Sequence, residues 1–302
     1  MDRELRVRQA AFEFLAQRCP EPDDTIHWRD LQSRFIVDGE PVILIGQKGI
    51  WKPKQLDLPI SLITAPPKPN KPAPYDDHVT DDGLLAYRYR GDNPSHPDNI
   101  AVRRCFQDQV PLIYFHGIEK SIYLPVWPVF VVADSPGALT FTIAVEDPIA
   151  LRPDLTIEQI DPAQRRYTTQ LVKRRVHQAA FRERVLAAYR RTCAICRLNQ
   201  AELLEAAHII PDSSFDGDPV VPNGLSLCTI HHAAFDRHIL GIRPDLVIEL
   251  RQDILDAIDG PMLRYGLQGF HGEKLLMPRS ATDRPDADRL ERRYEEFRTI
   301  AA

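Results

Sequence analysis

Residues 190–240 read RRTCAICRLNQAELLEAAHIIPDSSFDGDPVVPNGLSLCTIHHAAFDRHIL, and this stretch contains two close pairs of metal-binding side chains. Cys193 and Cys196 form the first pair, and Cys228 and His231 form the second. Zinc prefers four cysteine or histidine ligands in a tetrahedron, and each close pair can supply two of them. We therefore expect a structural Zn²⁺ held by three cysteines and one histidine. The alternative, incidental core cysteines, does not explain the pairing at both ends.

Three further polar residues follow in the order His208, Asn223 and His232. The pattern EAAHI…NGLSLC…HHAAFD resembles the HNH nuclease family, and the resemblance covers residues 180–250. It implies a ββα-metal fold, with the first histidine on a strand, the asparagine in the connecting loop and the last histidine on a helix. In the commonest zinc-bearing version the helix opens with Cys-x2-Cys-His, whereas here His231 replaces the second cysteine.

Phosphodiester hydrolysis explains why these residue types are used. The reaction needs an activated water and a cation on the phosphoryl group. His208 is the candidate general base, because a near-neutral pKa suits proton removal from water. His232 is a candidate ligand of a catalytic Mg²⁺ or Mn²⁺. Asn223 either binds that cation through its amide oxygen or orients the loop that holds His208.

Several alternatives stay open at these positions. His208 could be a core histidine, Asn223 a turn residue in PNG, and His232 a partner of a zinc ligand that does not itself bind the metal. Asp236, on the same helical face as His232, either completes the metal shell, orients a histidine or stabilises the helix. Many HNH enzymes carry a metal ligand directly before the base, but this chain has Ala207 there. Glu205 is expected to point to the strand face opposite His208, so His208 itself is an alternative metal ligand.

The rest of the chain predicts an α+β protein with two domains. Residues 1–155 are expected to form the first domain, because a helical pattern over residues 1–18 and a hairpin signal at Asp38-Gly39 precede several short apolar runs. Residues 156–180 read as a linker and a basic helix, 181–260 as the nuclease domain and 261–302 as a charged C-terminal tail. The strand-like runs are LLAYRYR, VPLIYFHG, PVFVVAD and ALTFTIAVE.

The first domain contains PYDDHVTDDGLLAYRYRG at residues 74–91. This stretch resembles the SET- and RING-associated (SRA) domain, a reader of modified cytosine with a curved, partly open β-barrel of the SRA/PUA-like type. The resemblance implies a pocket for a flipped base formed by Tyr75, Asp76, Asp77 and Tyr89, followed by Gly91. The two tyrosines would stack on the base, and Asp77 would accept from cytosine N4. The alternative is that the tyrosines pack a sheet and the acids form a solvated turn.

Charge is unevenly distributed along the chain. The net charge is −5, yet residues 165–197 hold ten lysines and arginines and a single acid, Glu183. A local basic stripe is suited to contact the DNA backbone, although it could also be a solvated helix face. The candidate phosphate contacts are Arg88, Arg90, Arg174 and Arg175, with Lys48, Arg103 and Arg104 as further candidates.

Cysteine usage and hydropathy restrict the cellular setting. The five cysteines are an odd number, and three of them fall in the metal-binding stretch, which favours metal over disulfides in a reducing compartment. Cys19 and Cys105 are expected to be core thiols. The sequence has no apolar run long enough to span a membrane, and its charged N-terminus does not read as a signal peptide. We expect a cytoplasmic protein without a membrane partner.

Together these patterns predict a modification-dependent restriction endonuclease that acts on double-stranded DNA carrying modified cytosine, most simply 5-methylcytosine. A double-strand break would require two protomers or two visits, because one HNH site nicks one strand; a homodimer is therefore a hypothesis. One alternative is a non-catalytic reader of modified DNA with a zinc scaffold. Another is an HNH nuclease that recognises a different mark, such as hydroxymethylcytosine or a phosphorothioate.

Overall fold

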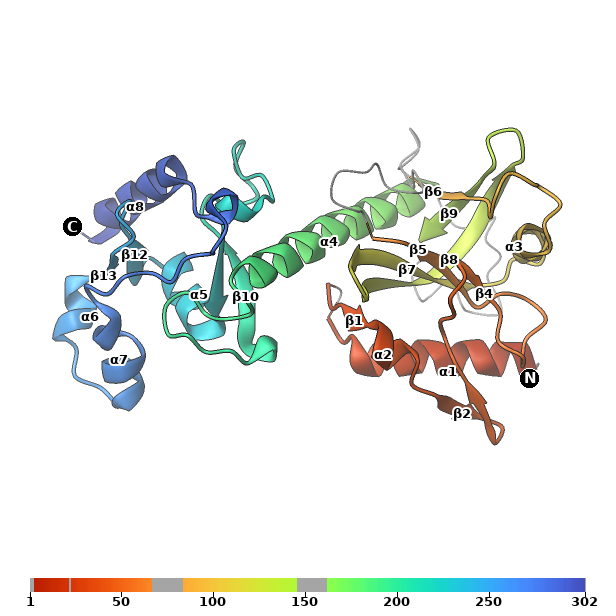
Figure 1. The fold of residues 1–302 in the computed structure, drawn as a ribbon, viewed down its shortest axis with the longest axis horizontal. Coiled ribbons are helices and arrows are strands. Elements are labelled where there is room, and N and C mark those ends of the chain that lie inside the picture. The colour runs from red at the N-terminus through yellow and green to blue at the C-terminus, as the bar shows by residue number, and fades with distance from the viewer. Residues whose placement is uncertain (1–2, 22, 67–83, 146–161, 302) are drawn as a thin grey trace. The chain divides into compact units, whose positions relative to one another are not determined.

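The computed structural model describes residues 3–21, 23–66, 84–145 and 162–301. The chain divides into two compact units, residues 1–179 and 180–302, and the division falls within helix α4 (Pro162–Ala188). Each unit combines helices and strands, so the predicted α+β class is confirmed (Figure 1). Among the helices in the described ranges, none has both the length and the apolar character needed to cross a bilayer.

The N-terminal unit is built around one seven-stranded sheet in the order β4-β5-β7-β8-β9-β6, with β1 paired to β8. Strands β5 and β7 are parallel, and the other neighbours are antiparallel. The register shifts between Val131 and Ala133, and such a bulge bends a strand. The sheet curls into a half-barrel, as predicted (Figure 1). Its strands are β1 (Ile26–His27), β4 (Ile50–Trp51), β5 (Ser61–Thr64), β6 (Leu85–Arg88), β7 (Leu112–Glu119), β8 (Ile122–Ser135) and β9 (Thr140–Val145).

Helix α1 (Arg3–Arg18) packs an apolar face into the core of this unit, which confirms the helix predicted for residues 1–18. The predicted hairpin is also present: β2 (Phe35–Val37) pairs with β3 (Glu40–Val42). Asp38 and Gly39 have φ angles of 51° and 79°, the left-handed pair that such a tight turn requires. Helices α2 (Trp28–Leu31) and α3 (Pro97–Gln107) complete the unit.

The C-terminal unit contains the expected two strands and a helix. Strand β10 (Leu204–His208) pairs antiparallel with β11 (Gly224–Cys228), and α5 (Thr229–Asp236) follows directly. The end of α4 packs tightly on this hairpin: a Cβ on Gly224 would lie 2.4 Å from Val185 and 2.9 Å from Phe181. The remaining elements are β12 (Leu240–Ile242), β13 (Ile248–Leu250), α6 (Gln252–Asp256), α7 (Pro261–Gly266) and α8 (Ala287–Ala301).

Residues beyond 260 belong to this unit rather than forming a separate tail. Leu290 and Phe297 of α8 are 1% and 2% exposed, and α8 contacts β12. The Phe297 ring packs closely on Gly241, where a Cβ would lie only 2.6 Å from the ring, so this position favours glycine. The charged composition of α8 did not indicate this packing, because a few apolar positions at helical spacing are enough to bury one face of a helix.

Gly117 in β7 offers a test of the sheet packing. A Cβ there would lie 2.5 Å from both the Thr64 carbonyl oxygen and the Pro66 nitrogen, and backbone atoms cannot rotate aside. Gly117→Ala should lower the free energy of unfolding by about 1–3 kcal/mol. Tryptophan fluorescence during denaturation reports on this unit, because Trp28, Trp51 and Trp127 all lie in it.

Gly137→Ala is the matched control, because nothing lies within 4 Å of a Cβ at that position. Equal midpoints for the two variants would show that the close approach at Gly117 does not limit stability.

Candidate active site and DNA-reading cavity

The four predicted zinc ligands meet at one point of the C-terminal unit. Their ligand atoms all lie within 4.8 Å of one another. The Cys196 and Cys228 sulfurs are 3.9 Å apart, and His231 Nδ1 is 3.1 Å from the Cys228 sulfur. A tetrahedral zinc with bonds of about 2.3 Å would separate two sulfurs by roughly 3.8 Å. The donor set and its spacing therefore fit a structural metal such as zinc.

The imidazole of His231 is held in the orientation that metal binding requires. Its Nδ1 faces the sulfurs of Cys193 and Cys228, at 3.6 and 3.1 Å. On the opposite side of the ring, Nε2–H donates to the Gly266 carbonyl over 2.9 Å, and the Phe270 ring packs edge-on at 5.4 Å. Such an outer hydrogen bond leaves Nδ1 unprotonated and free to bind a metal.

His208 ends β10 and has the features of a general base. Its ring stacks on Phe181 with centroids 4.0 Å apart. Its Nε2 is buried and has no hydrogen-bond partner within the described ranges. Burial lowers the pKa of His208, and the nearby Asp212 carboxylate opposes this only in part. A neutral imidazole with an unused nitrogen can accept a proton from water.

Asn223 is fully buried and its amide is committed to the backbone of the β10–β11 connection. Oδ1 accepts from Ile210 N–H at 2.9 Å. Nδ2 donates to the carbonyls of Ile210 and Asp218 at 3.0 and 3.1 Å. Because the amide oxygen already accepts a backbone hydrogen bond, this geometry favours the loop-orienting alternative over cation ligation. The clamp begins two residues after His208 and so steadies the end of its strand.

His232 lies on α5 between two carboxylates. Its Nδ1 makes a short hydrogen bond with Glu205, and its Nε2 lies 3.2 Å from Asp236 Oδ2. Although burial lowers it, the bonds to Asp236 and Glu205 raise the pKa of His232 overall. The two acids contact opposite edges of the ring, so a cation could bind His232 only after one carboxylate released its nitrogen.

The sequence analysis expected Glu205 on the strand face opposite His208 and did not foresee what Glu205 contacts. Glu205 contacts both His232 and Thr229 of α5, and the Thr229 hydroxyl donates to Glu205 at 3.2 Å. Helix α5 contacts β10, and no local pattern in the sequence indicates this contact. Glu205 and Asp236 join His232 as candidates for the catalytic cation site.

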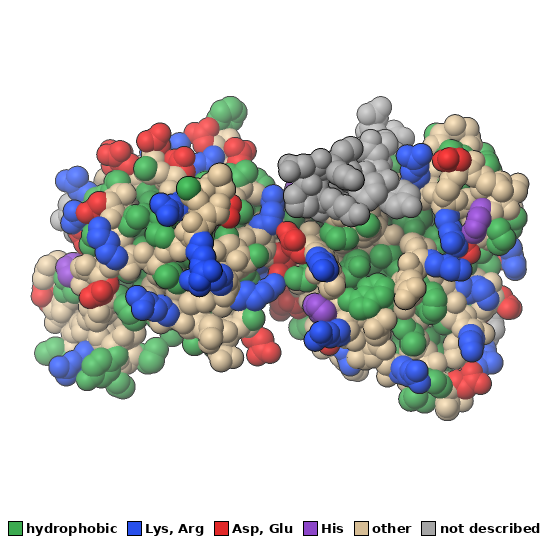
Figure 2. Space-filling model, viewed as in Figure 1, with side chains coloured by type: hydrophobic (Ala, Val, Ile, Leu, Met, Phe, Trp, Pro, Cys, Tyr) green, Lys and Arg blue, Asp and Glu red, His purple; other side chains and the backbone are tan. Residues whose placement is uncertain are grey.

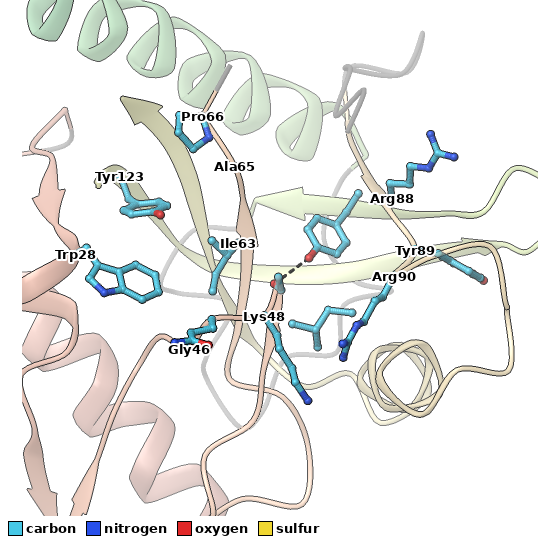
Figure 3. Close-up of a pocket in the computed structure, with 14 residues that line it drawn as sticks. Trp28, Gly46, Lys48, Ile63, Ala65, Pro66, Arg88, Tyr89, Arg90 and Tyr123 are labelled. Carbon is cyan, nitrogen blue, oxygen red and sulfur yellow. Dashed lines mark hydrogen bonds between the residues drawn. The ribbon is translucent and has the colours of Figure 1, made fainter. Parts of the chain in front are cut away.

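The N-terminal unit has a cavity of about 560 Å³ (Figure 3). Trp28 and Tyr123 lie side by side on one wall, with ring centroids 6.0 Å apart and an interplanar angle of 44°. Tyr87 forms another part of the wall and donates to the Gly49 carbonyl over 2.8 Å. The other lining residues are Gly46, Gln47, Lys48, Gly49, Ile50, Ile63, Ala65, Pro66, Arg88, Tyr89 and Arg90.

Tyr89 does not present its ring to this cavity. It is fully buried, stacks on Phe141 at 4.4 Å, and points away from Trp28 and Tyr123 (Figure 3). Its hydroxyl contacts the Asp134 carboxylate and accepts from Arg103 at 3.0 Å. The sheet-packing alternative therefore describes Tyr89. The other predicted pocket residues, Tyr75, Asp76 and Asp77, lie outside the described residues.

The predicted phosphate contacts fall in different surroundings. Arg88 is half-exposed and lies 3.8 Å from Asp92, whereas Arg90 pairs with Asp98. Arg175 is partly buried, and the side chain of Arg174 is outside the described residues. Figure 2 shows hydrophobic side chains gathered in the middle of the visible face of the N-terminal unit, with lysine and arginine side chains around them. Lys48 and Arg104 are exposed, but Arg103 is held by Asp134.

Comparison with known proteins agrees with the geometry of the C-terminal unit. Residues 193–243 match the model of the HNH endonuclease family. The match begins at the first zinc cysteine and includes β10, β11 and α5. The C-terminal unit thus carries an HNH endonuclease domain, which makes the chain a DNA endonuclease of that class and confirms the prediction.

One solved structure, the modification-dependent TagI restriction endonuclease, is similar to the chain at 16% identity over 79% of this chain and 81% of that chain. The TM-score is 0.30, and a superposition this loose does not establish a common fold. No curated protein matches the sequence.

The Cys₃His cluster predicts about one zinc per purified chain. Metal bound in such a site contributes on the order of 10 kcal/mol to folding, so a strong chelator should unfold the C-terminal unit. Cys228→Ala should abolish zinc in elemental analysis and lower the melting temperature by circular dichroism. Cys105→Ala is the control, because this buried thiol lies outside the cluster. Zinc retained in full by Cys228→Ala would contradict the site.

Asn223→Ala tests the loop clamp. The variant leaves the buried amide and carbonyl of Ile210 without their side-chain partner, at a cost of about 1–3 kcal/mol for each such group. We expect a lower melting temperature and faster amide exchange at Ile210, with zinc content unchanged. Unaltered exchange at Ile210 would contradict the clamp.

Proposed function

We propose that the chain is a modification-dependent DNA endonuclease, in which the C-terminal unit cuts DNA and the N-terminal unit recognises a modified cytosine. The observation that carries the proposal is the arrangement of His208 and His232. His208 is a neutral histidine whose buried Nε2 has no hydrogen-bond partner among the described residues, and the charge of His232 influences its pKa. His232 in turn contacts the carboxylates of Glu205 and Asp236. A scaffold would need only the four zinc ligands.

In the proposed reaction, His208 accepts the proton of the attacking water through Nε2. Asn223 keeps the loop after His208 in place, so that this nitrogen stays aimed at the phosphate. His232, with Asp236 or Glu205, would hold a divalent cation, Mg²⁺ or Mn²⁺. Such a cation supplies charge stabilisation to the phosphoryl and leaving oxygens. Phe181 excludes solvent from one face of His208 and favours its neutral form.

The cavity of the N-terminal unit is the proposed site for the flipped base. Its volume of about 560 Å³ lies in the range of small-molecule sites. Trp28 and Tyr123 offer the aromatic surfaces that replace lost base stacking. Lys48, Arg88 and Arg90 line the same cavity and suit neighbouring phosphates. Tyr75, Asp76 and Asp77 remain proposed contacts of the base, with 5-methylcytosine as the favoured mark.

Three further statements belong to this proposal. Arg174 and Arg175 on α4 would contact the DNA backbone. Two copies of the chain would act together on a double strand, since each has one HNH site. The protein would work in the cytoplasm, where reduced cysteines keep the zinc site intact.

The test of the function is cleavage of matched duplexes that carry cytosine, 5-methylcytosine, hydroxymethylcytosine, glucosylated hydroxymethylcytosine or a phosphorothioate, with Mg²⁺ or Mn²⁺. We expect cleavage of the 5-methylcytosine duplex, loss of at least about 100-fold in rate for His208→Ala, and no cutting in chelator. Cleavage of another modified duplex instead would change the mark but keep the nuclease. No metal-dependent cleavage of any duplex, with binding retained, would favour a non-catalytic reader.

Trp28→Ala tests the base cavity separately from catalysis. Loss of one stacking surface should weaken binding of the modified duplex by roughly 5- to 150-fold, the equivalent of about 1–3 kcal/mol. Affinity for unmodified DNA should change little. Ile36→Ala, an exposed hairpin residue outside the cavity, is the control. If Trp28→Ala lost affinity for both duplexes equally, the residue would contribute to general DNA binding and not to recognition of the mark.

A further inference from the structure

Helix α8 lies outside the matched HNH stretch, residues 193–243, and yet it contacts both halves of the proposed active site. It is seated on the unit by Leu290 and Phe297, which are buried. The helix also carries several arginines, one of them buried on the same face as Leu290 and Phe297, and three of the arginines reach segments that carry proposed catalytic residues. These three are Arg289, Arg292 and Arg293.

The first contact is with the end of helix α5. Arg293 is 8% exposed, and its guanidinium donates to the Phe235 carbonyl at 3.2 Å and stacks over the Phe235 ring at 5.0 Å. Phe235 directly precedes Asp236, the residue that contacts His232 Nε2. Glu296, one turn along α8, accepts from Arg293 at 3.0 Å and holds the guanidinium in this position. The arginine thereby ties the C-terminal turn of α5 to α8.

The second contact is with the connection between β10 and β11. Arg292 pairs with Asp216 at 2.8 Å, and Arg289 lies 3.7 Å from Asp218. Asp218 is also the residue whose carbonyl accepts from the Asn223 amide. Ahead of the helix, the Asp286 amide donates to the Pro222 carbonyl over 2.9 Å, directly beside Asn223. The helix and the residue before it therefore contact the half of the connection that leads into β11, at Asp216, Asp218 and Pro222.

We propose that α8 is a brace of the catalytic centre, and that Arg293 is its principal positioning residue. The brace sets the position of the His208–Asn223 loop relative to the His232–Asp236 turn of α5. This inference rests on the proposed function, because it assigns a role in the geometry of that site. Arg293 is buried and acts through its contacts with Phe235 and through its charge, which helps to lower the pKa of the neighbouring Asp236.

Arg293→Met removes the guanidinium but keeps much of the side-chain volume. Partners that orient catalytic groups from outside typically contribute 10- to 100-fold, so we expect kcat to fall by roughly that factor and the half-saturating Mn²⁺ concentration to rise. KM for the DNA should stay near its wild-type value, because Arg293 is buried away from solvent. Arg293→Lys should recover part of the activity, since it keeps the charge but not the planar stacking group. Arg298→Met, an exposed arginine of the same helix, is the matched control.

A charge exchange tests the second contact without disturbing the core. Arg292→Asp and Asp216→Arg should each lower kcat several-fold at low salt, and the double variant should recover it. A structural effect alone would lower the melting temperature without changing the Mn²⁺ requirement, so both are measured for every variant.

The outcomes separate the brace from the function on which it rests. Wild-type protein that cuts no duplex would overturn the proposed function. Wild-type cutting with normal kcat and Mn²⁺ dependence in Arg293→Met would overturn the brace alone. A loss in Arg293→Met that Arg293→Lys does not relieve, with an unchanged Mn²⁺ requirement, would also overturn it.

Discussion

Convergence of Cys193, Cys196, Cys228 and His231 is the constraint on which the C-terminal unit depends. These side chains come from the turn after α4, the end of β11 and the first turn of α5, so a bound metal would join three segments at one point. A small two-stranded hairpin is only marginally stable by itself. The cluster at one end and the packing of α4 on Gly224 together hold the hairpin that ends in His208.

Several buried polar side chains of this unit form hydrogen bonds with backbone groups. The amide of Asn223 makes three hydrogen bonds within the described part of the chain, all to the backbone of Ile210 and Asp218. His231 uses its outer nitrogen on Gly266, which links α7 to the metal site. A buried loop cannot rely on apolar packing alone, because it carries many backbone groups that need hydrogen-bond partners. Buried amide and imidazole groups supply those partners without adding charge.

The N-terminal unit is built differently, on one curled sheet with a cavity lined partly by aromatic side chains. Strand β1 pairs with β8 at Tyr123, and this pairing brings Trp28, at the start of α2, beside the Tyr123 ring. Tyr89, directly after β6, stacks on Phe141 and contacts Asp134 through its hydroxyl. Both tyrosines of AYRYR line the cavity, but Tyr89 turns its ring away from Trp28 and Tyr123.

The sequence by itself determined the features that depend on local chemistry. The four residues of the metal-ligand cluster were recognisable because each pair is close in the chain. The Asp38-Gly39 hairpin was recognisable because few residues tolerate its left-handed turn. Only the tertiary structure decided which side chains meet across elements. Alternation along β10 cannot show that α5 brings His232 to Glu205. The composition of α8 suggested a solvated tail, yet a few buried apolar residues are enough to dock it and place Arg293 against Phe235. Contacts between segments far apart in sequence depend on packing geometry, which local residue patterns do not contain.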